Sequence, residues 1–278
     1  MQGSLGRVAA LCYFALFMAA ASPAISYARV AKSFDFGRVQ ALRDVSLDIA
    51  AGEFRCIVGG SGSGKTTLLR LANRLIDPDA GTVSVGGADV RGVDPIRLRR
   101  SVGYVFQSAA LFPHMTVAEN IGITPKLLAA PAAGIAARAD ELLTLVRLDA
   151  ARYRDRYPHE LSGGERQRVG VARALAAKPS IVLMDEPFGA LDPLTRDALA
   201  DDYRALHRDL NLTTVFITHD MTEAIVLADR IAVMQTGTLV EEGTAATLAA
   251  SSNPYVGELL RTPRRQTERL NAVLTGAP

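Results

Sequence analysis

The chain has 278 residues, 49% of them hydrophobic, and a formal net charge of +2 at pH 7. This length suits one large α/β domain, or one domain with a smaller inserted lobe, and the hydrophobic share excludes wholesale disorder. The small charge gives no indication of a nucleic-acid coat, and the two cysteines, Cys12 and Cys56, lack metal or disulfide spacing, which suits a reducing cytoplasm.

The N-terminal segment, residues 1–24, has the pattern of a secretory signal peptide. Arg7 precedes an unbroken apolar run over residues 8–21, and Ser22-Pro23-Ala24 follows. The run is short for a membrane-spanning helix, which needs about 20 residues. Because the motifs further along require a cytosolic location, we interpret residues 1–24 as lying outside the fold, either through a misplaced start upstream of Ile25 or as an uncleaved membrane anchor.

Residues 25–107 alternate predicted strands with one predicted helix. The strands are expected at 25–30, 42–49, 54–58, 82–85 and 102–106. A helix beginning at Lys65 is predicted by apolar residues that share one face, namely Leu68, Leu71, Ala72 and Leu75. Turn residues at 77–81 end it, and Cys56 is expected in the core.

Residues 108–160 lose the strand pattern and favour an inserted helical lobe. Thr116 and Glu119 have the spacing of a capping box, which begins a helix. A second helix shows an apolar stripe formed by Ala139, Leu142, Leu143 and Val146.

Residues 161–260 return to alternating helices and strands. Ser162 with Glu165 forms another capping box, for a helix to about residue 177, and Asp192-Pro193 begins a further helix. Strands are expected at 181–184 and 213–218, a helix from Asp220, a hairpin over 231–240 and a helix from residue 253, followed by a loose basic tail over 261–278. This alternation favours a largely parallel sheet covered by helices.

Residues 59–66 match the P-loop pattern, with a predicted strand before them and a helix after. Glycines let successive N–H groups curl around phosphate oxygens, and the helix N-terminus adds positive potential. Lys65 is expected to reach the β- and γ-phosphates, and Thr66 to offer its hydroxyl to Mg²⁺. The residues predicted to bind ATP are Gly59, Ser61, Gly62, Ser63, Gly64, Lys65, Thr66 and Thr67. The alternative is an ordinary glycine turn.

The strand at 181–184 ends in two carboxylates. Asp185 is placed to bind Mg²⁺, directly or through water, and Glu186 is placed to polarise an attacking water. A strand that ends in Asp-Glu is weak evidence for a nucleotide site by itself. It becomes strong evidence in a sequence that also contains a P-loop.

Residues 161–167 combine a helix cap with two glycines. Ser162, Gly163 and Gly164 would leave backbone N–H groups free to bind an anion, although an ordinary helix cap explains the same pattern.

This segment resembles the signature sequence of the ABC ATPase family, and its position between the P-loop and the two carboxylates agrees. The resemblance covers about residues 25–260. It implies an α/β P-loop NTPase fold with a three-layer core, antiparallel N-terminal strands and an inserted helical subdomain. The catalytic core would comprise 25–107 and 161–250, and the helical subdomain 108–160.

The resemblance also implies roles for further residues. Gln107 is similar to the Q-loop glutamine, which senses Mg²⁺ or water, and His219 to the switch histidine near the γ-phosphate. Asp192 closes a segment similar to the D-loop. Phe34 is similar in position to the aromatic that stacks on adenine, with Phe36 as the alternative.

Departures from the family pattern are small. Gly60 stands where proline is frequent, and Thr66 where serine is frequent. Neither of these two changes removes a required donor. Glu165 and Arg166 replace glutamines that are often found there.

The family resemblance implies that two copies enclose two ATP molecules, with Ser162 and Gly164 of one copy contacting the nucleotide of the other. Integral-membrane permease subunits would dock on the helical lobe near Gln107, at the cytoplasmic face of the membrane, with a substrate-binding protein as an indirect partner. No nucleic-acid partner is expected.

Several stretches are most similar to the glycine betaine, choline and carnitine importer branch; one is Asn73-Arg74-Leu75-Ile76. Some members carry C-terminal regulatory domains, which we do not expect here. Import of polar amino acids or another small solute stays open. A soluble ATPase acting on DNA or ribosomes also stays open, although the long coiled-coil insertion or second motif set usual there is absent from this sequence.

Overall fold

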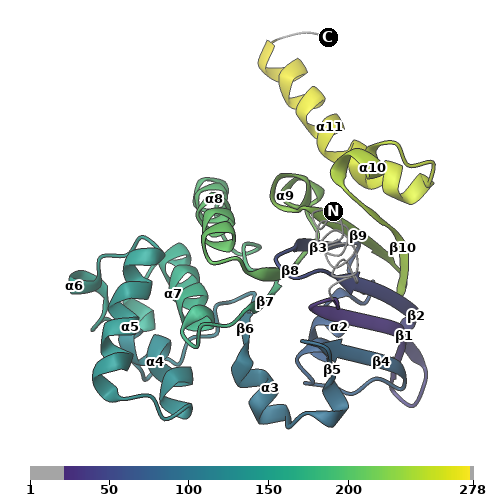
Figure 1. Cartoon of the computed structure of the whole chain (residues 1–278). Helices are drawn as coiled ribbons and strands as arrows, with labels where there is room; N and C mark the ends of the chain where they lie inside the picture. The colour runs from purple at the N-terminus through teal and green to yellow at the C-terminus, as the bar shows by residue number, and fades with distance from the viewer. Residues whose placement is uncertain (1–21, 276–278) are drawn as a thin grey trace, which may run out of the picture.

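Two β-sheets form the centre of the computed structural model, which describes residues 22–275 (Figure 1). The larger sheet has six strands in the order β10-β9-β3-β8-β7-β6, and all neighbours are parallel except the β9–β10 pair. Its strands are β10 (Thr238–Gly243), β9 (Arg230–Gln235), β3 (Phe54–Val58), β8 (Thr213–Thr218), β7 (Ile181–Asp185) and β6 (Val102–Val105). The predicted largely parallel sheet is confirmed.

The smaller sheet is antiparallel and lies beside the larger one. Its strands, in spatial order, are β2 (Val39–Ile49), β1 (Ile25–Phe34), β4 (Ala80–Val85) and β5 (Ala88–Asp89). Helix α2 (Lys65–Ala72) packs between the two sheets, where Leu68, Leu69 and Leu71 are fully buried. Tyr27 of β1 donates its hydroxyl proton to the Leu68 carbonyl at 3.0 Å. The small sheet therefore fixes the helix that follows the P-loop.

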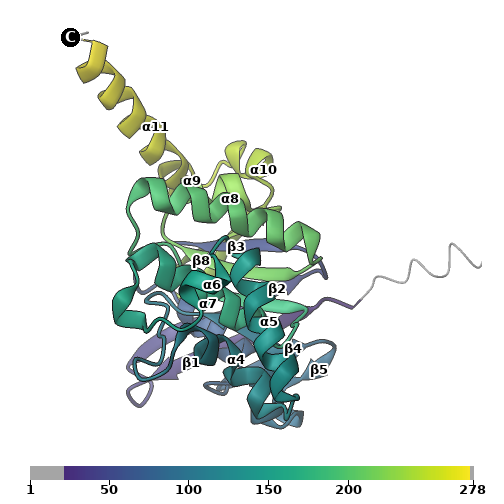
Figure 2. The same ribbon diagram turned by 90° about the vertical axis from the view of Figure 1, so that its left-hand side faces the viewer.

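The opposite face of the large sheet is covered by helices, as Figure 2 shows for α8 above β3 and β8. Side chains alternate along β3, so Phe54, Cys56 and Val58 face these helices while Ile57 faces α2. The covering helices are α7 (Gly163–Leu175), α8 (Pro193–Asp209) and α9 (Met221–Leu227). Cys56 is a core residue, as predicted.

Residues 108–160 hold helices, as predicted, and they group with α7 at one side of the molecule (Figure 1). The elements are α4 (Val117–Leu127), α5 (Ala132–Leu145), α6 (Ala150–Tyr153) and the 3-10 turn η2 (Pro158–Glu160). Both predicted capping boxes are present, at Thr116 and at Ser162. The four residues of the predicted α5 stripe are all buried. Asn120 is fully buried, and its side chain bonds the backbone of Phe112, Met115 and Thr116, which fixes the loop before α4.

The remaining elements are short, apart from the last helix. They are η1 (Val90–Gly92), α3 (Pro95–Ser101), α10 (Ala245–Ala249) and α11 (Pro254–Thr275). The predicted hairpin turn is formed by Thr236 and Gly237, both at positive φ, as a tight two-residue connection requires. Within residues 22–275, no helix is long and apolar enough to cross a membrane.

Four sequence expectations differ from the structure. Leu75 does not share the α2 face and is 44% exposed, because the helix ends at Ala72 and Arg74 turns the chain with a φ of 46°. The first two strands are longer than predicted and form a hairpin. Helix α11 continues to Thr275, through the segment expected to be loose after residue 260. The fold also begins earlier than expected, because Ala24, assigned to the N-terminal segment 1–24, packs against the core and accepts the Gly86 N–H at 2.8 Å. For residues 1–21, that interpretation lies outside the described residues.

Candidate functional site

The predicted site residues follow the carboxyl ends of neighbouring parallel strands. Lys65 follows β3 and its loop, Asp185 ends β7, and His219 follows β8. Gln107 follows β6. Because these ends share one edge of the sheet, residues from four parts of the sequence gather there, where ligands of open α/β sheets bind.

The P-loop curls tightly between β3 and α2. Gly59, Gly62 and Gly64 have positive φ values of 155°, 74° and 100°, and a Cβ on Gly64 would lie 2.5 Å from the Ala41 carbonyl oxygen. No side chain caps α2, so its first N–H groups have no side-chain partner at the cap. This end of the helix is therefore built to receive an anion.

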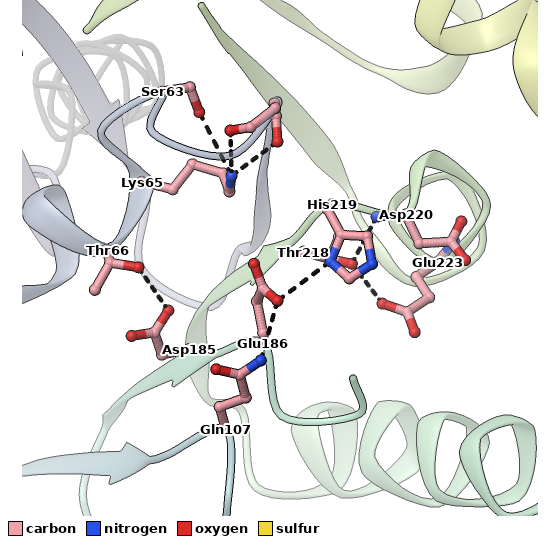
Figure 3. A network of polar contacts seen from close by, with 12 residues as sticks. Ser63, Lys65, Thr66, Gln107, Asp185, Glu186, Thr218, His219, Asp220 and Glu223 are labelled. Carbon is pink, nitrogen blue, oxygen red and sulfur yellow. Dashed lines mark hydrogen bonds and ion pairs between the residues drawn. The ribbon is translucent and has the colours of Figure 1, made fainter. Parts of the chain in front are cut away.

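The Lys65 ammonium is folded back onto the same loop (Figure 3). Its Nζ donates to the carbonyl oxygens of Gly59 at 2.7 Å and Gly60 at 2.9 Å. Burial lowers the pKa of Lys65, while the nearby carboxylates of Glu186 and Asp185 oppose that shift. The ammonium is thus held by groups that a phosphate could replace.

Thr66 and Asp185 form the pair that could hold a divalent cation. Thr66 donates its hydroxyl proton to Asp185 Oδ1 at 3.0 Å (Figure 3). In residues 22–275, no group of three His, Cys, Asp or Glu side chains could hold a metal by itself. This donor set fits Mg²⁺, which is usually held by one or two protein oxygens together with nucleotide phosphates and water.

Asp185→Asn is expected to stabilise the nucleotide-free protein. Burial raises the pKa of Asp185, so the folded state binds its proton more tightly than the unfolded chain does. This proton binding stabilises the folded state fully below the usual carboxyl pKa, about 4. The stabilisation is lost as the pH rises through the raised pKa of Asp185. We expect the melting temperature at pH 7 to rise by about 2–4 °C, after discounting for solvent screening.

Thermal unfolding of the two proteins at pH 4 and pH 7 tests this expectation. The difference should shrink at pH 4, where the wild-type carboxyl is more protonated than at pH 7. The matched control is Asp201→Asn on the exposed side of α8, which should leave the melting temperature unchanged. A lower melting temperature for Asp185→Asn at pH 7 would contradict the argument.

Glu186 lies at the centre of a polar cluster with Gln107 and His219 (Figure 3). Its Oε2 accepts a hydrogen bond from Gln107 Nε2 at 3.4 Å and lies 3.2 Å from His219 Nδ1. Glu186 has a φ of 45°, an uncommon conformation for a non-glycine residue, and its N–H donates to the Ile217 carbonyl at 3.1 Å. Strained backbone of this kind is frequent at functional sites because it aims a side chain.

The turn that carries His219 is held by Thr218 and Glu223, to which the sequence analysis assigned no role at the site. Thr218 donates to Glu223 Oε2 at 2.6 Å and accepts the Asp220 N–H at 3.0 Å. A threonine that ends a buried strand, with a carboxylate five residues later, was the available signal.

The signature residues lie at the N-terminus of α7, apart from this cluster. Among residues 22–275, no hydrogen bond joins Ser162, Gly163 or Gly164 to the P-loop. Gly164 instead packs against α8, because a Cβ there would lie 2.4 Å from Thr195 Cγ2. Asp192 caps α8 by accepting the Thr195 N–H at 3.0 Å.

The two aromatic candidates for an adenine contact are placed differently. Phe34 ends β1, is 39% exposed, and has the Lys32 ammonium 5.6 Å from its ring centroid. Phe36 lies in the following turn and is fully exposed. The ring of Phe34 is therefore held by more contacts than the ring of Phe36.

The fold and these loops define a P-loop nucleotide-binding protein. The family model described as ABC transporter matches residues 42–189. The chain belongs to the ABC transporter family.

Two curated relatives and one solved structure illustrate the similarity. The chain is 50% identical over 233 residues to the glycine betaine/carnitine/choline transport ATP-binding protein OpuCA of Bacillus subtilis, covering 84% of this chain and 61% of that protein. It is 46% identical to the glycine betaine uptake system ATP-binding protein YehX of Escherichia coli, covering 84% of this chain and 75% of that protein. A dimeric ATP-binding cassette bound to ADP and phosphate matches with a TM-score of 0.72 and 34% identity, over 79% of this chain and 98% of that one.

Proposed function

We propose that this chain binds and hydrolyses ATP at the described site, as the nucleotide-binding subunit of an importer at the cytoplasmic face of the membrane. The observation that carries the proposal is one cluster at one sheet edge. There the P-loop lysine, the Thr66–Asp185 pair and the Glu186–His219 pair all meet.

Binding follows from the P-loop geometry. Phosphate oxygens of ATP replace the Gly59 and Gly60 carbonyls as partners of the Lys65 ammonium, and the exposed N–H groups at the start of α2 add further donors. Thr66, Asp185 and Gln107 would hold Mg²⁺, which would supply positive charge to the phosphate oxygens. Phe34 stacks on the adenine.

Hydrolysis uses the polar cluster around Glu186. Its carboxylate accepts a proton from, or orients, the water that attacks the γ-phosphate. Gln107 and His219 both contact the same oxygen, Oε2, so they hold the carboxylate in one orientation. His219, which is 65% exposed in its side chain, is free to turn toward the γ-phosphate.

The separation between the signature residues and the P-loop supports a homodimer. Ser162, Gly163 and Gly164 form a helix N-terminus that makes no hydrogen bond to the P-loop within residues 22–275, so this end can face the nucleotide of a second copy. The related cassette bound to ADP and phosphate is a dimer. Closure of the dimer on ATP and its reopening after hydrolysis would drive the membrane subunits.

A groove beside Gln107 supports docking of a permease subunit. Phe106, Phe112 and Leu127, each at least 40% exposed, line it between β6 and the helical lobe. Arg99 and Arg173 add positive charge at its edge. An apolar groove with a basic rim suits an amphipathic helix, and its place next to Gln107 couples that helix to the ATP site.

The cargo we propose is glycine betaine or a related quaternary amine, received through a substrate-binding protein and the permease. The support is the similarity to transport ATP-binding proteins of that description. The ATPase does not contact cargo, so this step rests on similarity alone.

Uptake of labelled glycine betaine at high osmolarity tests the cargo. The gene is deleted in a host that lacks other betaine carriers and restored as wild type or as Glu186→Gln. We expect uptake to fall to background and to return only with wild type. Uptake that survives the deletion would reject this cargo, and polar amino acids and other small solutes would then be tested in the same strains.

A further inference from the structure

The P-loop has a hydrogen-bond partner far away in the sequence. The N–H of Gly60 donates to the hydroxyl oxygen of Tyr255 at 3.0 Å. Tyr255 belongs to the first turn of α11, 195 residues further along the chain. The C-terminal helix is therefore bonded directly to the loop that receives the nucleotide.

This hydrogen bond acts on a peptide group that also holds Lys65. The peptide between Gly59 and Gly60 offers its carbonyl oxygen to the Lys65 ammonium at 2.7 Å and its N–H to Tyr255. In a trans peptide these two groups point in opposite directions, so the two bonds fix the peptide plane from both ends.

Tyr255 is itself held firmly. Asn253 caps the start of α11 by accepting the N–H of Tyr255 at 3.0 Å, and Val256 is fully buried in the main core. Ser251 donates to Glu241 of β10 and accepts the Asn253 N–H at 3.0 Å. The hydroxyl that meets Gly60 is thus carried by a rigid support, anchored to the core and to the large sheet.

Only a residue with an N–H at position 60 can make this bond. Proline at this position would have no N–H to donate. In this chain, glycine provides the donor and Tyr255 provides the acceptor, and a Cβ at position 60 would lie 3.7 Å from the Tyr255 oxygen, an ordinary contact. The pair can therefore be dissected with conservative changes on both sides.

We propose that Tyr255 is a positioning residue for nucleotide binding, which acts through the Gly59–Gly60 peptide to hold the P-loop backbone in the conformation that receives phosphate. The inference rests on the proposed function, because it assumes that the loop binds ATP. Preorganised donors lose less freedom on binding than mobile ones, so loss of the hydroxyl weakens affinity.

A double-mutant cycle on the full chain tests the proposal. ATP affinity is measured by calorimetry, without divalent cations so that ATP is not hydrolysed, for wild type, Tyr255→Phe, Gly60→Pro and the double variant. We expect Tyr255→Phe to weaken affinity about fivefold, the size of one net hydrogen bond. In the Gly60→Pro background the same change should have no effect, because the donor is already absent. Gly60→Ala keeps the N–H and should preserve the fivefold effect.

The outcomes separate this inference from the proposed function. If wild type binds ATP and Tyr255→Phe leaves affinity unchanged, the inference fails and the proposed function stands. If Tyr255→Phe weakens affinity equally in the Gly60→Pro background, Tyr255 acts through the general stability of α11 and the inference also fails. Thermal unfolding without nucleotide identifies that case, since a structural role lowers the melting temperature. If wild type binds no ATP, both fail.

Discussion

Glu186→Gln is expected to lower the ATP hydrolysis rate by at least about 100-fold while leaving ATP binding intact. A general base contributes about 10²- to 10⁴-fold to a rate, and the amide cannot accept the proton of the attacking water. The substitution keeps the shape of the side chain and an oxygen that Gln107 can still reach. ATP should therefore accumulate in its bound, unhydrolysed form, and light scattering with ATP and Mg²⁺ should show a stable dimer.

The control for this variant is Glu141→Gln, which removes a carboxylate from a surface ion pair on α5. It should hydrolyse ATP at the wild-type rate and dimerise only transiently. If Glu186→Gln remains monomeric with ATP, the assigned dimer mechanism is wrong. If it retains the wild-type rate, another group activates the water.

Many helices, strands and turns could be predicted from the sequence, because the interactions that form them join residues close together in the chain. The capping boxes at Thr116 and Ser162 need only a residue and its third successor, and both are present. The strand over Phe54–Val58 is buried throughout, and four of its five residues are apolar, Arg55 being the exception, so its composition predicted it. The hairpin turn at Thr236 and Gly237 follows from the glycine that a tight connection needs.

The site was readable for a different reason. Lys65 follows β3 through the P-loop, Asp185 ends β7 and His219 follows β8, and parallel strands bring their carboxyl ends to one edge. The P-loop and the strand-end carboxylates pointed to one nucleotide site, and the family resemblance added His219 to it. The conformation of Glu186 was not readable, because its positive φ depends on the bond from its N–H to Ile217 on the neighbouring strand.

The predictions that failed concern places where tertiary structure overrides the local sequence pattern. Leu75 continues the helical period of α2, yet Arg74 leaves the helix because the chain must turn toward β4. The contact from Tyr255 to Gly60 has no local signal, since it joins a core loop to the C-terminal helix. Such contacts between distant segments depend on the packed fold.

Lys65→Ala is expected to weaken ATP affinity by about 10²- to 10³-fold. Charge-assisted hydrogen bonds contribute about 1.5–3 kcal/mol each, and the ammonium can meet both the β- and the γ-phosphate. Two such bonds at the weaker end contribute about 3–4 kcal/mol together, which converts to an affinity loss of about 10²- to 10³-fold. Calorimetric titration of the purified chain with ATP measures the change.

The fold should survive this change, because the folded protein gains little from Lys65 when no nucleotide is bound. Burial lowers the pKa of the ammonium, so the charged form is disfavoured there, and its bonds to Gly59 and Gly60 only offset that cost. The melting temperature without nucleotide should stay at or above the wild-type value. The control Lys126→Ala, on the exposed surface of α4, should bind ATP as wild type does. An unchanged ATP affinity in Lys65→Ala would mean that the lysine remains on its carbonyls when nucleotide binds, and the P-loop assignment would fail at its central residue.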